Sequence, residues 1–541
     1  MTATVTAKLK ASYSDSVEPT AKEPPPLRLV RLLMPSMSDL VFVVLLFGLS
    51  VGALGRLLLR DADTGWHIRN GQQMLLTHAV PRVDSFSATM TGHPWYAWEW
   101  LYDLLIAAIH QALGLNGVVF YSAAVIAATF AIVLYLATER GSNLVVTLFL
   151  LVLALGASAI HLLARPHIVS WLLAVIWFQI LDSAAVRPSA ATFRRLLWLP
   201  ALMLLWVNLH GGFLFGFILL GAYLAGVAIQ YVSRPQARAQ LTGILRRLGA
   251  AILLSGLVSL INPYGYKLHI HIAHYVTDRY LMDAISEFRS PNFHGGAQQF
   301  FVVLMLVTIV VLTSARRRPH PAHLLVMLFA VFSGLYAARN LPVSSLLLTL
   351  LIAPVLSETI STAGSSGASQ WVRAVCARID NFGSRMRQTE LRLGGHLWLV
   401  AGFVIGLWAC ANGGRLGSAQ LVNAYFDPQR FPVEAVKTVV QDQIREPIFS
   451  LDYWGGYLIY RLYPSNQVFI DDRHDFYGDA YLKDYLKVTL AQPGWDKVLD
   501  AEHVNWVLIP DESPLASVLR ISPQWKTFHE DYTAVLFKRN P

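Results

Sequence analysis

Charged residues are scarce in this chain, since only 14% of its 541 residues are Asp, Glu, Lys or Arg. Soluble domains average about 25%, so a single water-soluble globule is excluded. A disordered chain is excluded as well, because 55% of the residues are hydrophobic. The chain has only two cysteines, Cys376 in a basic segment and Cys410 in an apolar run. They exclude a disulfide framework.

Long apolar runs take the place of the missing charge. A helix that crosses a bilayer needs about 20 residues, and shorter runs suffice where protein covers their ends. The run over 101–137 is too long for one helix, so we expect its first part at the membrane interface. We count about eleven runs, at 39–59, 101–137, 143–161, 167–186, 196–210, 212–232, 248–262, 299–314, 322–338, 342–356 and 396–412.

These runs predict an α-helical polytopic membrane protein. Its expected fold has about eleven transmembrane helices and a small C-terminal α/β domain. Residues 1–38 are polar and include three consecutive prolines, which predicts a disordered cytoplasmic tail without a cleavable signal. Residues 39–412 form the predicted transmembrane domain, with a long first outer loop over 60–100. Residues 413–541 form the predicted α/β domain. Its expected strands are 447–451, 467–470, 506–509 and 533–538, and its expected helices are 480–490 and 495–501.

The net charge of +9 does not indicate nucleic-acid binding, because Lys and Arg of a membrane protein collect in its cytoplasmic loops. Basic clusters precede the first run, follow the fourth, sixth and eighth, and fill 373–392. With alternating crossings they all fall on the side of the N-terminus. We therefore expect a multi-pass plasma (inner) membrane protein with a cytoplasmic N-terminus and an extracytoplasmic C-terminal domain. The segments then expected outside are 61–100, 161–167, 208–212, 262–298 and 339–340.

Two aspartates open the first outer loop. Asp61 and Asp63 can point the same way on an extended segment. They can then hold a divalent cation such as Mg²⁺ or Mn²⁺, or one of them can act as a base. A structural alternative stays open for Asp63, which can cap a helix over 64–78.

The same loop ends in two more carboxylates. Glu99 and Asp103 share one face of a helix and repel each other, so a substrate, a cation or a nearby Arg is expected to relieve them. The aromatic residues around them fit a belt at the height of the lipid headgroups, as simple anchors or as a support for the carboxylates. These aromatic residues are Trp95, Tyr96, Trp98, Trp100 and Tyr102.

The loop resembles part of a known enzyme family. Asp-x-Asp-x-x-Trp-His from Asp61 and Glu-Trp-Leu from Glu99, directly after the first apolar run, resemble the GT-C glycosyltransferases. The resemblance is to their bacterial protein-mannosyltransferase-like and arabinosyltransferase-like members, and extends over most of the chain as architecture but only over short patches as motif. It implies transfer of a sugar from a polyprenyl phosphate or pyrophosphate to a glycan, lipid or protein acceptor. It also implies that an acidic first-loop residue is the base or a metal ligand, a role that falls on Asp61, with Asp63 second.

A lipid phosphate leaving group needs positive charge around it. Arg165, His167 and Arg339 lie at outer ends of the apolar runs, and Arg suits phosphate through its bidentate fork. The alternative for both arginines is contact with lipid headgroups.

The candidates for sugar or acceptor contacts are Glu99, Asp103, His210 and Glu287. A tight turn is the alternative for His210, and an ion pair with Arg289 is the alternative for Glu287. A transporter or flippase of lipid-linked glycans remains a second hypothesis, and a non-catalytic membrane-anchored glycan-binding protein a third. Apolar runs almost free of charge favour the enzyme over the transporter. Its expected partners are the donor, the acceptor and membrane lipids.

Overall fold

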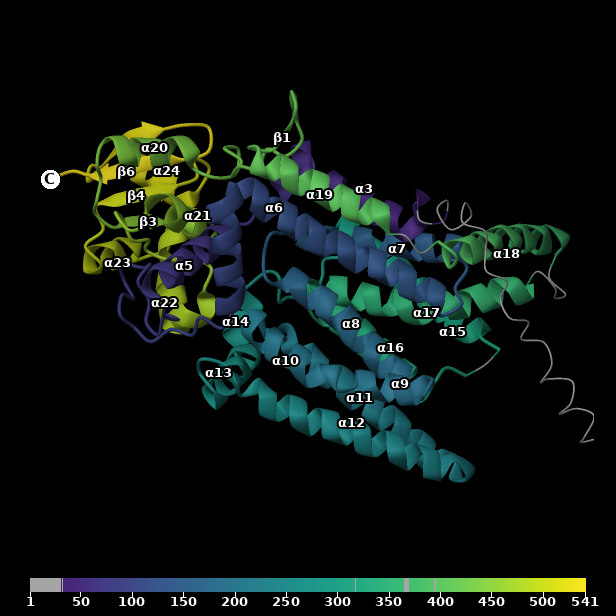
Figure 1. Cartoon of the computed structure of the whole chain (residues 1–541). Helices are drawn as coiled ribbons and strands as arrows, with labels where there is room; N and C mark the ends of the chain where they lie inside the picture. The colour runs from purple at the N-terminus through teal and green to yellow at the C-terminus, as the bar shows by residue number, and fades with distance from the viewer. Residues whose placement is uncertain (1–30, 32, 317, 364–368, 394–395) are drawn as a thin grey trace, which may run out of the picture.

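The computed structural model describes residue 31 and residues 33–316, 318–363, 369–393 and 396–541. Long apolar helices form a bundle, and the segment 413–541 lies at one end of it (Figure 1). In the described residues eight helices are long and apolar enough to cross a membrane, so the chain is a helical multi-pass membrane protein. They are Trp100–Glu139, Leu144–His161, His167–Val186, Ala190–Leu209, Gly211–Ser233, Pro235–Ser259, Gly296–Ser314 and Ala338–Ala363.

Three shorter apolar helices coincide with the remaining predicted runs. They are α3 (Met37–Ser50), α16 (Pro321–Tyr336) and α19 (Leu397–Ala411). A capping box starts α3, because the Ser36 hydroxyl accepts from the Asp39 N–H while the Asp39 carboxylate accepts from the Ser36 N–H. Of the predicted tail, residues 1–30 and 32 lie outside the described residues, as do 364–368 of the predicted linker.

The other helices of residues 52–390 include those of the predicted runs. The full set is α4 (Gly52–Leu57), α5 (Asp63–Thr77), α6 (Trp100–Glu139), α7 (Leu144–Ser158), α8 (His167–Val186), α9 (Ala190–Arg195), α10 (Trp198–Leu209), α11 (Leu214–Ser233), α12 (Arg238–Ser259), α13 (Tyr266–Thr277), α14 (Arg279–Ala284), α15 (Gly296–Ser314), α17 (Leu341–Ala363) and α18 (Gln370–Glu390). Of these helices, α5, α9, α13, α14 and α18 lie outside every predicted run.

The overlong second run breaks inside α6. Gly114 has φ 61° and ψ −160°, a conformation outside the helical region. Because only glycine adopts this backbone readily, it joins two helices into one 40-residue element. The part before Gly114 carries the end of the first loop, and the part after it runs through the bundle.

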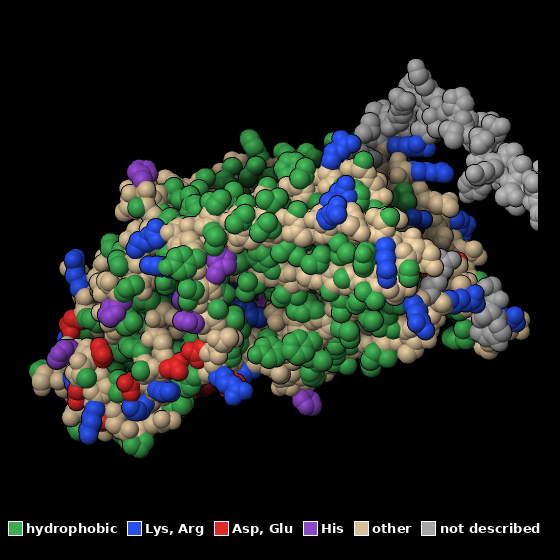
Figure 2. All heavy atoms as spheres, turned by 90° about the horizontal axis from the view of Figure 1, so that it is seen from below, with side chains coloured by type: hydrophobic (Ala, Val, Ile, Leu, Met, Phe, Trp, Pro, Cys, Tyr) green, Lys and Arg blue, Asp and Glu red, His purple; other side chains and the backbone are tan. Residues whose placement is uncertain are grey.

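The two ends of the bundle differ in charge. The end that carries residues 413–541 is called the site end here, and the other is called the basic end. Figure 2 shows Lys and Arg side chains at the basic end, and most of the acidic side chains visible on that face around the site end. Asp182 of α8 is a buried carboxylate inside an apolar span. It is paired there, since it lies 3.1 Å from Arg140 and 2.5 Å from His323.

Residues 413–541 form a small α/β segment. Its four-stranded sheet has the order β3-β4-β6-β5, with β3 (Ile448–Ser450) parallel to β4 (Trp506–Ile509) and the other pairs antiparallel. The predicted strand over 467–470 is wrong, since Val468 makes only isolated bridges. The remaining elements are β1 (Arg415–Leu416), β2 (Ala419–Gln420), α20 (Val433–Gln441), α21 (Asp452–Leu462), α22 (His474–Thr489), α23 (Trp495–Ala501), α24 (Pro514–Ile521), β5 (Trp525–Glu530) and β6 (Val535–Arg539).

The first loop packs directly on this segment. Helix α5 crosses α21 so closely that a Cβ on Gly65 would lie 2.3 Å from the Gly456 carbonyl oxygen. The Arg69 guanidinium donates from Nε and Nη2 to the backbone oxygen of Tyr460, at 2.8 and 2.5 Å. First-loop residues share one hydrophobic cluster with α20, α21 and the sheet. These residues are Ala62, Trp66, Phe86, Trp95 and Ala97.

A buried arginine completes the contact. The Arg473 guanidinium lies 2.8 Å from Asp84 of the first loop and 2.7 Å from Asp471. It also lies 4.5 Å from the Trp95 ring centre. Because Arg473 is only 4% exposed, removing either carboxylate would leave a poorly solvated charge. The first loop and the C-terminal segment are therefore held together by charge as well as by apolar packing.

Candidate functional site

Three predicted residues meet at the start of α5. The Arg165 guanidinium lies 2.9 Å from Asp61 and 2.7 Å from Asp63. The cap interpretation of Asp63 is wrong, because Asp63 is the first residue of α5 and Ala62 is the N-cap without a side-chain bond. Asp61 instead accepts the Asp63 N–H, at 2.9 Å. The Asp63 backbone N–H is thus bound by Asp61, while the Asp63 carboxylate is paired with Arg165.

The C-terminal segment adds a third carboxylate. Oxygen atoms of Asp61, Asp63 and Asp472 lie within 4.8 Å of one another, and Asp472 belongs to a second such group with Asp452 and His474. Burial raises the pKa of Asp472 well above its usual range, and Asp63, Asp452 and Asp61 raise it further. Carboxylates so close together repel, and a hard divalent cation with oxygen ligands would relieve the repulsion. The group offers oxygen atoms of the kind that such cations bind, and Arg165 already offsets part of its charge.

A histidine joins the two carboxylates at the end of the first loop. His67 Nδ1 lies 2.5 Å from Asp103, and its Nε2 lies 3.8 Å from Glu99. Asp103 also accepts from the Asn70 amide at 2.6 Å. His67 Nε2 is buried without a hydrogen-bond partner in the described structure. The chain itself therefore supplies polar partners for both carboxyl groups, with His67 between them and the Asn70 amide on Asp103.

Burial sets the protonation of this group. It raises the pKa of Glu99 to about 7, with His67 opposing the shift and Asp103 adding to it. It lowers the pKa of His67 to about 4, although Glu99 and Asp63 favour the charged ring. At neutral pH His67 is therefore uncharged, and Glu99 exchanges its proton readily. A carboxyl with this pKa suits a general acid or base.

His210 approaches Glu99 from the turn between α10 and α11. Its Nδ1 accepts the Gly212 N–H at 3.0 Å and lies 2.8 Å from the Ser170 hydroxyl. In the neutral ring the proton is then on Nε2, which lies 3.5 Å from Glu99. The turn interpretation of His210 therefore holds for one ring nitrogen, while the other faces Glu99.

The remaining predicted residues form a second pair. Arg339 lies 3.4 Å from the Glu287 carboxylate and donates its backbone N–H to the Glu287 carbonyl at 3.0 Å. Glu287 therefore pairs with Arg339, and Arg289 forms no ion pair within the described chain. Burial alone would raise the pKa of Glu287, but Arg339 and then Arg165 lower it. Both arginines thus act on one carboxylate.

His167 is less available than predicted. Its Nε2 lies 2.8 Å from the His161 carbonyl, so the ring is tied to the backbone of the preceding turn. In the neutral ring Nδ1 then carries no proton and cannot donate to a phosphate.

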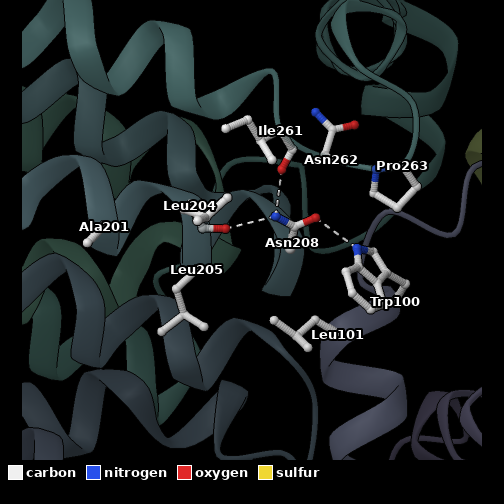
Figure 3. Close-up of a pocket in the computed structure, with 9 residues that line it drawn as sticks. All are labelled: Trp100, Leu101, Ala201, Leu204, Leu205, Asn208, Ile261, Asn262 and Pro263. Atoms are coloured by element: carbon white, nitrogen blue, oxygen red, sulfur yellow. Dashed lines mark hydrogen bonds between the residues drawn. The ribbon is translucent and has the colours of Figure 1, made fainter.

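An open, mostly apolar groove starts at Trp100, the residue that follows Glu99 in the chain. It has a volume of about 630 Å³ and is lined by the start of α6, by α10 and by the turn after α12. Figure 3 shows Asn208 at its centre, accepting from the Trp100 indole at 2.8 Å and donating to the Ile261 carbonyl at 3.0 Å. Asn208 therefore holds the walls together, while Leu204 and Leu205 offer the apolar surface.

Several residues here were not predicted as site residues. Asp452, Asp472 and His474 lie in two stretches dense in acidic and aromatic residues, 452–457 and 471–479, whose sequence is typical of turns and caps or of glycan contacts. His67 belongs to the Trp-His part of the first-loop motif, but the sequence assigned it no role in the site. No local spacing connects Asp452, Asp472 and His474 to Asp61.

No protein-family model matches the chain, and none of the curated proteins matches it.

Proposed function

We propose that the chain is a GT-C-like glycosyltransferase that moves a sugar from a polyprenyl-(pyro)phosphate donor to a glycan, lipid or protein acceptor at the extracytoplasmic face. The observation that carries the proposal is the meeting of Asp61 and Asp63 with Arg165 at the end of the bundle where the apolar groove opens. Such a site offers a proton acceptor, a phosphate ligand and a surface for a lipid chain.

In this proposal a carboxylate accepts the proton of the acceptor hydroxyl as the hydroxyl oxygen attacks the anomeric carbon. The bond from that carbon to the phosphate oxygen breaks, and its electron pair leaves with the lipid phosphate. One displacement inverts the anomeric centre. Asp61 is the proposed base, and Glu99 is the second candidate because its pKa lies near 7.

Arg165 and Arg339 are the proposed ligands of the leaving phosphate. Both are paired with carboxylates, at 2.9 Å for Asp61 and 3.4 Å for Glu287. A donor phosphate would exchange with these carboxylates as the partner of the guanidinium groups. Release of Asp61 from Arg165 would make its carboxylate free to accept a proton.

The groove that starts at Trp100 is the proposed path of the prenyl chain. A largely apolar surface one residue along the chain from a polar cluster matches a substrate with a lipid tail and a charged head. In the alternative in which Asp61 is a metal ligand, a divalent cation held by Asp61, Asp63 and Asp472 would neutralise phosphate charge at the same place, and Glu99 would be the base.

The same proposal requires a particular topology. If α3, α16 and α19 also cross the membrane, the eleven crossings put the N-terminus and the segment 413–541 on opposite sides. The basic end then faces the cytoplasm, and residues 413–541 form an extracytoplasmic domain that covers the site.

Donor turnover by the purified protein tests the proposal. Polyprenyl monophosphates and pyrophosphates carrying radiolabelled hexoses or pentoses are supplied in detergent, and water-soluble label is measured with and without candidate acceptors. We expect one donor to release its sugar, and Asp61→Asn to lower the rate by about a hundredfold or more. Asp484→Asn is the matched control, since Asp484 is 54% exposed on α22.

Equal rates for wild type and a folded Asp61→Asn variant would refute the base assignment. No turnover of any donor, together with movement of intact donor across a proteoliposome, would favour the flippase instead.

A further inference from the structure

Helix α18 carries an unpartnered basic and aromatic face at the basic end. Trp371, Arg378, Phe382 and Arg385 fall within about 60° of one another at 100° per residue. Trp371 is 75% exposed and Phe382 is 54% exposed, and both arginines are exposed. This surface is called the α18 stripe below.

Other faces of α18 are fixed to the bundle. Ile379 and Met386 pack against the main core, and the Ile379 carbonyl accepts from the Asn143 amide at the start of α7, at 3.0 Å. The Arg387 guanidinium donates to the Thr138 carbonyl near the end of α6, at 2.8 Å. The helix therefore cannot turn its stripe inward without breaking these contacts.

The start of α3 gives α18 a second attachment. The Glu390 carboxylate accepts the backbone N–H groups of Met37 and Ser38, at 2.6 and 3.1 Å. A carboxylate at a helix N-terminus binds unpaired N–H groups and the positive end of the helix dipole. Since Glu390 is used in this way, it does not offset the arginines of the stripe.

The stripe keeps an uncompensated positive charge. Residues 370–392 contain five arginines and two acids, and of these acids Glu390 is buried on α3 while Asp380 accepts from Ser384. Among the described residues neither Arg378 nor Arg385 forms an ion pair. The exposed arginines therefore suit an anionic partner.

We propose that the α18 stripe binds the headgroups of anionic phospholipids in the leaflet at the basic end. The helix packs against the ends of membrane-spanning helices, where headgroups lie. Its aromatic side chains fit the boundary between headgroups and acyl chains, and its arginines fit lipid phosphates. The inference does not depend on the proposed function, because these residues lie at the end opposite to Asp61.

Lipid retention measured by native mass spectrometry tests the stripe. Purified protein in neutral detergent is titrated with phosphatidylglycerol or with phosphatidylcholine of the same chains. We expect tighter binding of phosphatidylglycerol, and a loss of about tenfold or more in Arg378→Gln/Arg385→Gln, because each basic residue near an anionic surface contributes about 1 kcal/mol. The control Arg194→Gln/Arg195→Gln removes the same charge from the last turn of α9 and should retain the preference. Equal losses in the two double variants, or no preference in the wild type, would overturn the proposal.

A second measurement leaves the arginines intact. Phe382→Cys, in a background with Cys376→Ala and Cys410→Ala, carries a fluorophore in nanodiscs that contain phosphatidylglycerol. We expect quenching by lipids with a nitroxide near the headgroup and little quenching by an aqueous quencher. Quenching from water alone, or protection from both quenchers by a protein partner, would contradict lipid binding.

Discussion

At the scale of single residues, the site is defined by carboxylates whose environments differ. Asp61 and Asp63 share Arg165, whereas Glu99 faces two histidines, His67 and His210. Burial and charge therefore separate their proton affinities, as in sites that perform acid–base chemistry at neutral pH. The sequence identified these carboxylates and Arg165, because each lies at a predicted end of an apolar run. It did not identify their partners, since the contact between Asp61 and Arg165 joins residues 104 positions apart.

The raised pKa of Glu99 predicts how the rate of turnover depends on pH. Burial raises that pKa to about 7, so the proton-accepting carboxylate is lost as pH falls through 7. If Glu99 takes part in the transfer, turnover falls about tenfold per pH unit below 7 and levels off above it. The Glu99→Gln variant should turn over slowly at all pH values, and its rate should not change around pH 7. An identical profile in both proteins would show that another group titrates.

Removal of Arg165 is predicted to destabilise the protein. Asp63 is 2% exposed, and without the guanidinium its charge is left buried. Breaking a buried pair typically costs about 3–5 kcal/mol, and the 22% exposure of Arg165 places the expected loss near the lower end, at about 3 kcal/mol. Thermal unfolding in detergent measures it. The double variant Arg165→Ala/Asp63→Asn should recover part of the loss, and an undiminished stability of Arg165→Ala would contradict the pairing.

At the scale of elements, the crossing of α5 and α21 positions the site. Gly65 and Gly456 allow the two helices to approach, and α5 begins at Asp63 while α21 begins at Asp452. Apolar runs predicted the bundle helices well, and the length of the second run predicted a break, which lies at Gly114. The crossing itself was not predictable, because glycine in a helix carries no signal about the helix that it contacts.

Gly456→Ala is predicted to disrupt this crossing. A Cβ at Gly456 would lie 2.3 Å from the Ala62 carbonyl oxygen, and overpacking of this kind costs about 1–3 kcal/mol. We expect lower thermal stability and faster proteolysis between 412 and 424. Gly221→Ala in α11 is the control, because its Cβ meets no atom within 4 Å. Equal behaviour of the two variants would contradict a tight crossing.

At the scale of the whole molecule, the first loop and the C-terminal segment form one unit at the site end. They share a hydrophobic cluster and the Arg473 contacts. The sequence predicted an appended α/β domain, because its β-like and helical runs follow the last apolar helix. Its contribution of Asp472 beside Asp61 could not be predicted, since it depends on how two distant parts of the chain pack.

This arrangement predicts a cation site built from both parts. We expect the purified protein to bind Mn²⁺, measured by electron paramagnetic resonance, and Asp61→Asn and Asp472→Asn each to weaken binding by about tenfold or more. Asp484→Asn should bind like the wild type. Loss of binding in Asp61→Asn alone would exclude Asp472 as a ligand, and absence of binding in the wild type would remove the cation from the proposed mechanism.

The most direct test of the central claim is the structure of the protein determined by electron cryomicroscopy with bound polyprenyl monophosphate. We predict that the phosphate lies within hydrogen-bond distance of Arg165 or Arg339, beside Asp61, and that the prenyl chain follows the groove along Leu204 and Leu205. A phosphate bound elsewhere, with Arg165 still paired to Asp61 and the groove free of lipid, would contradict the proposed site.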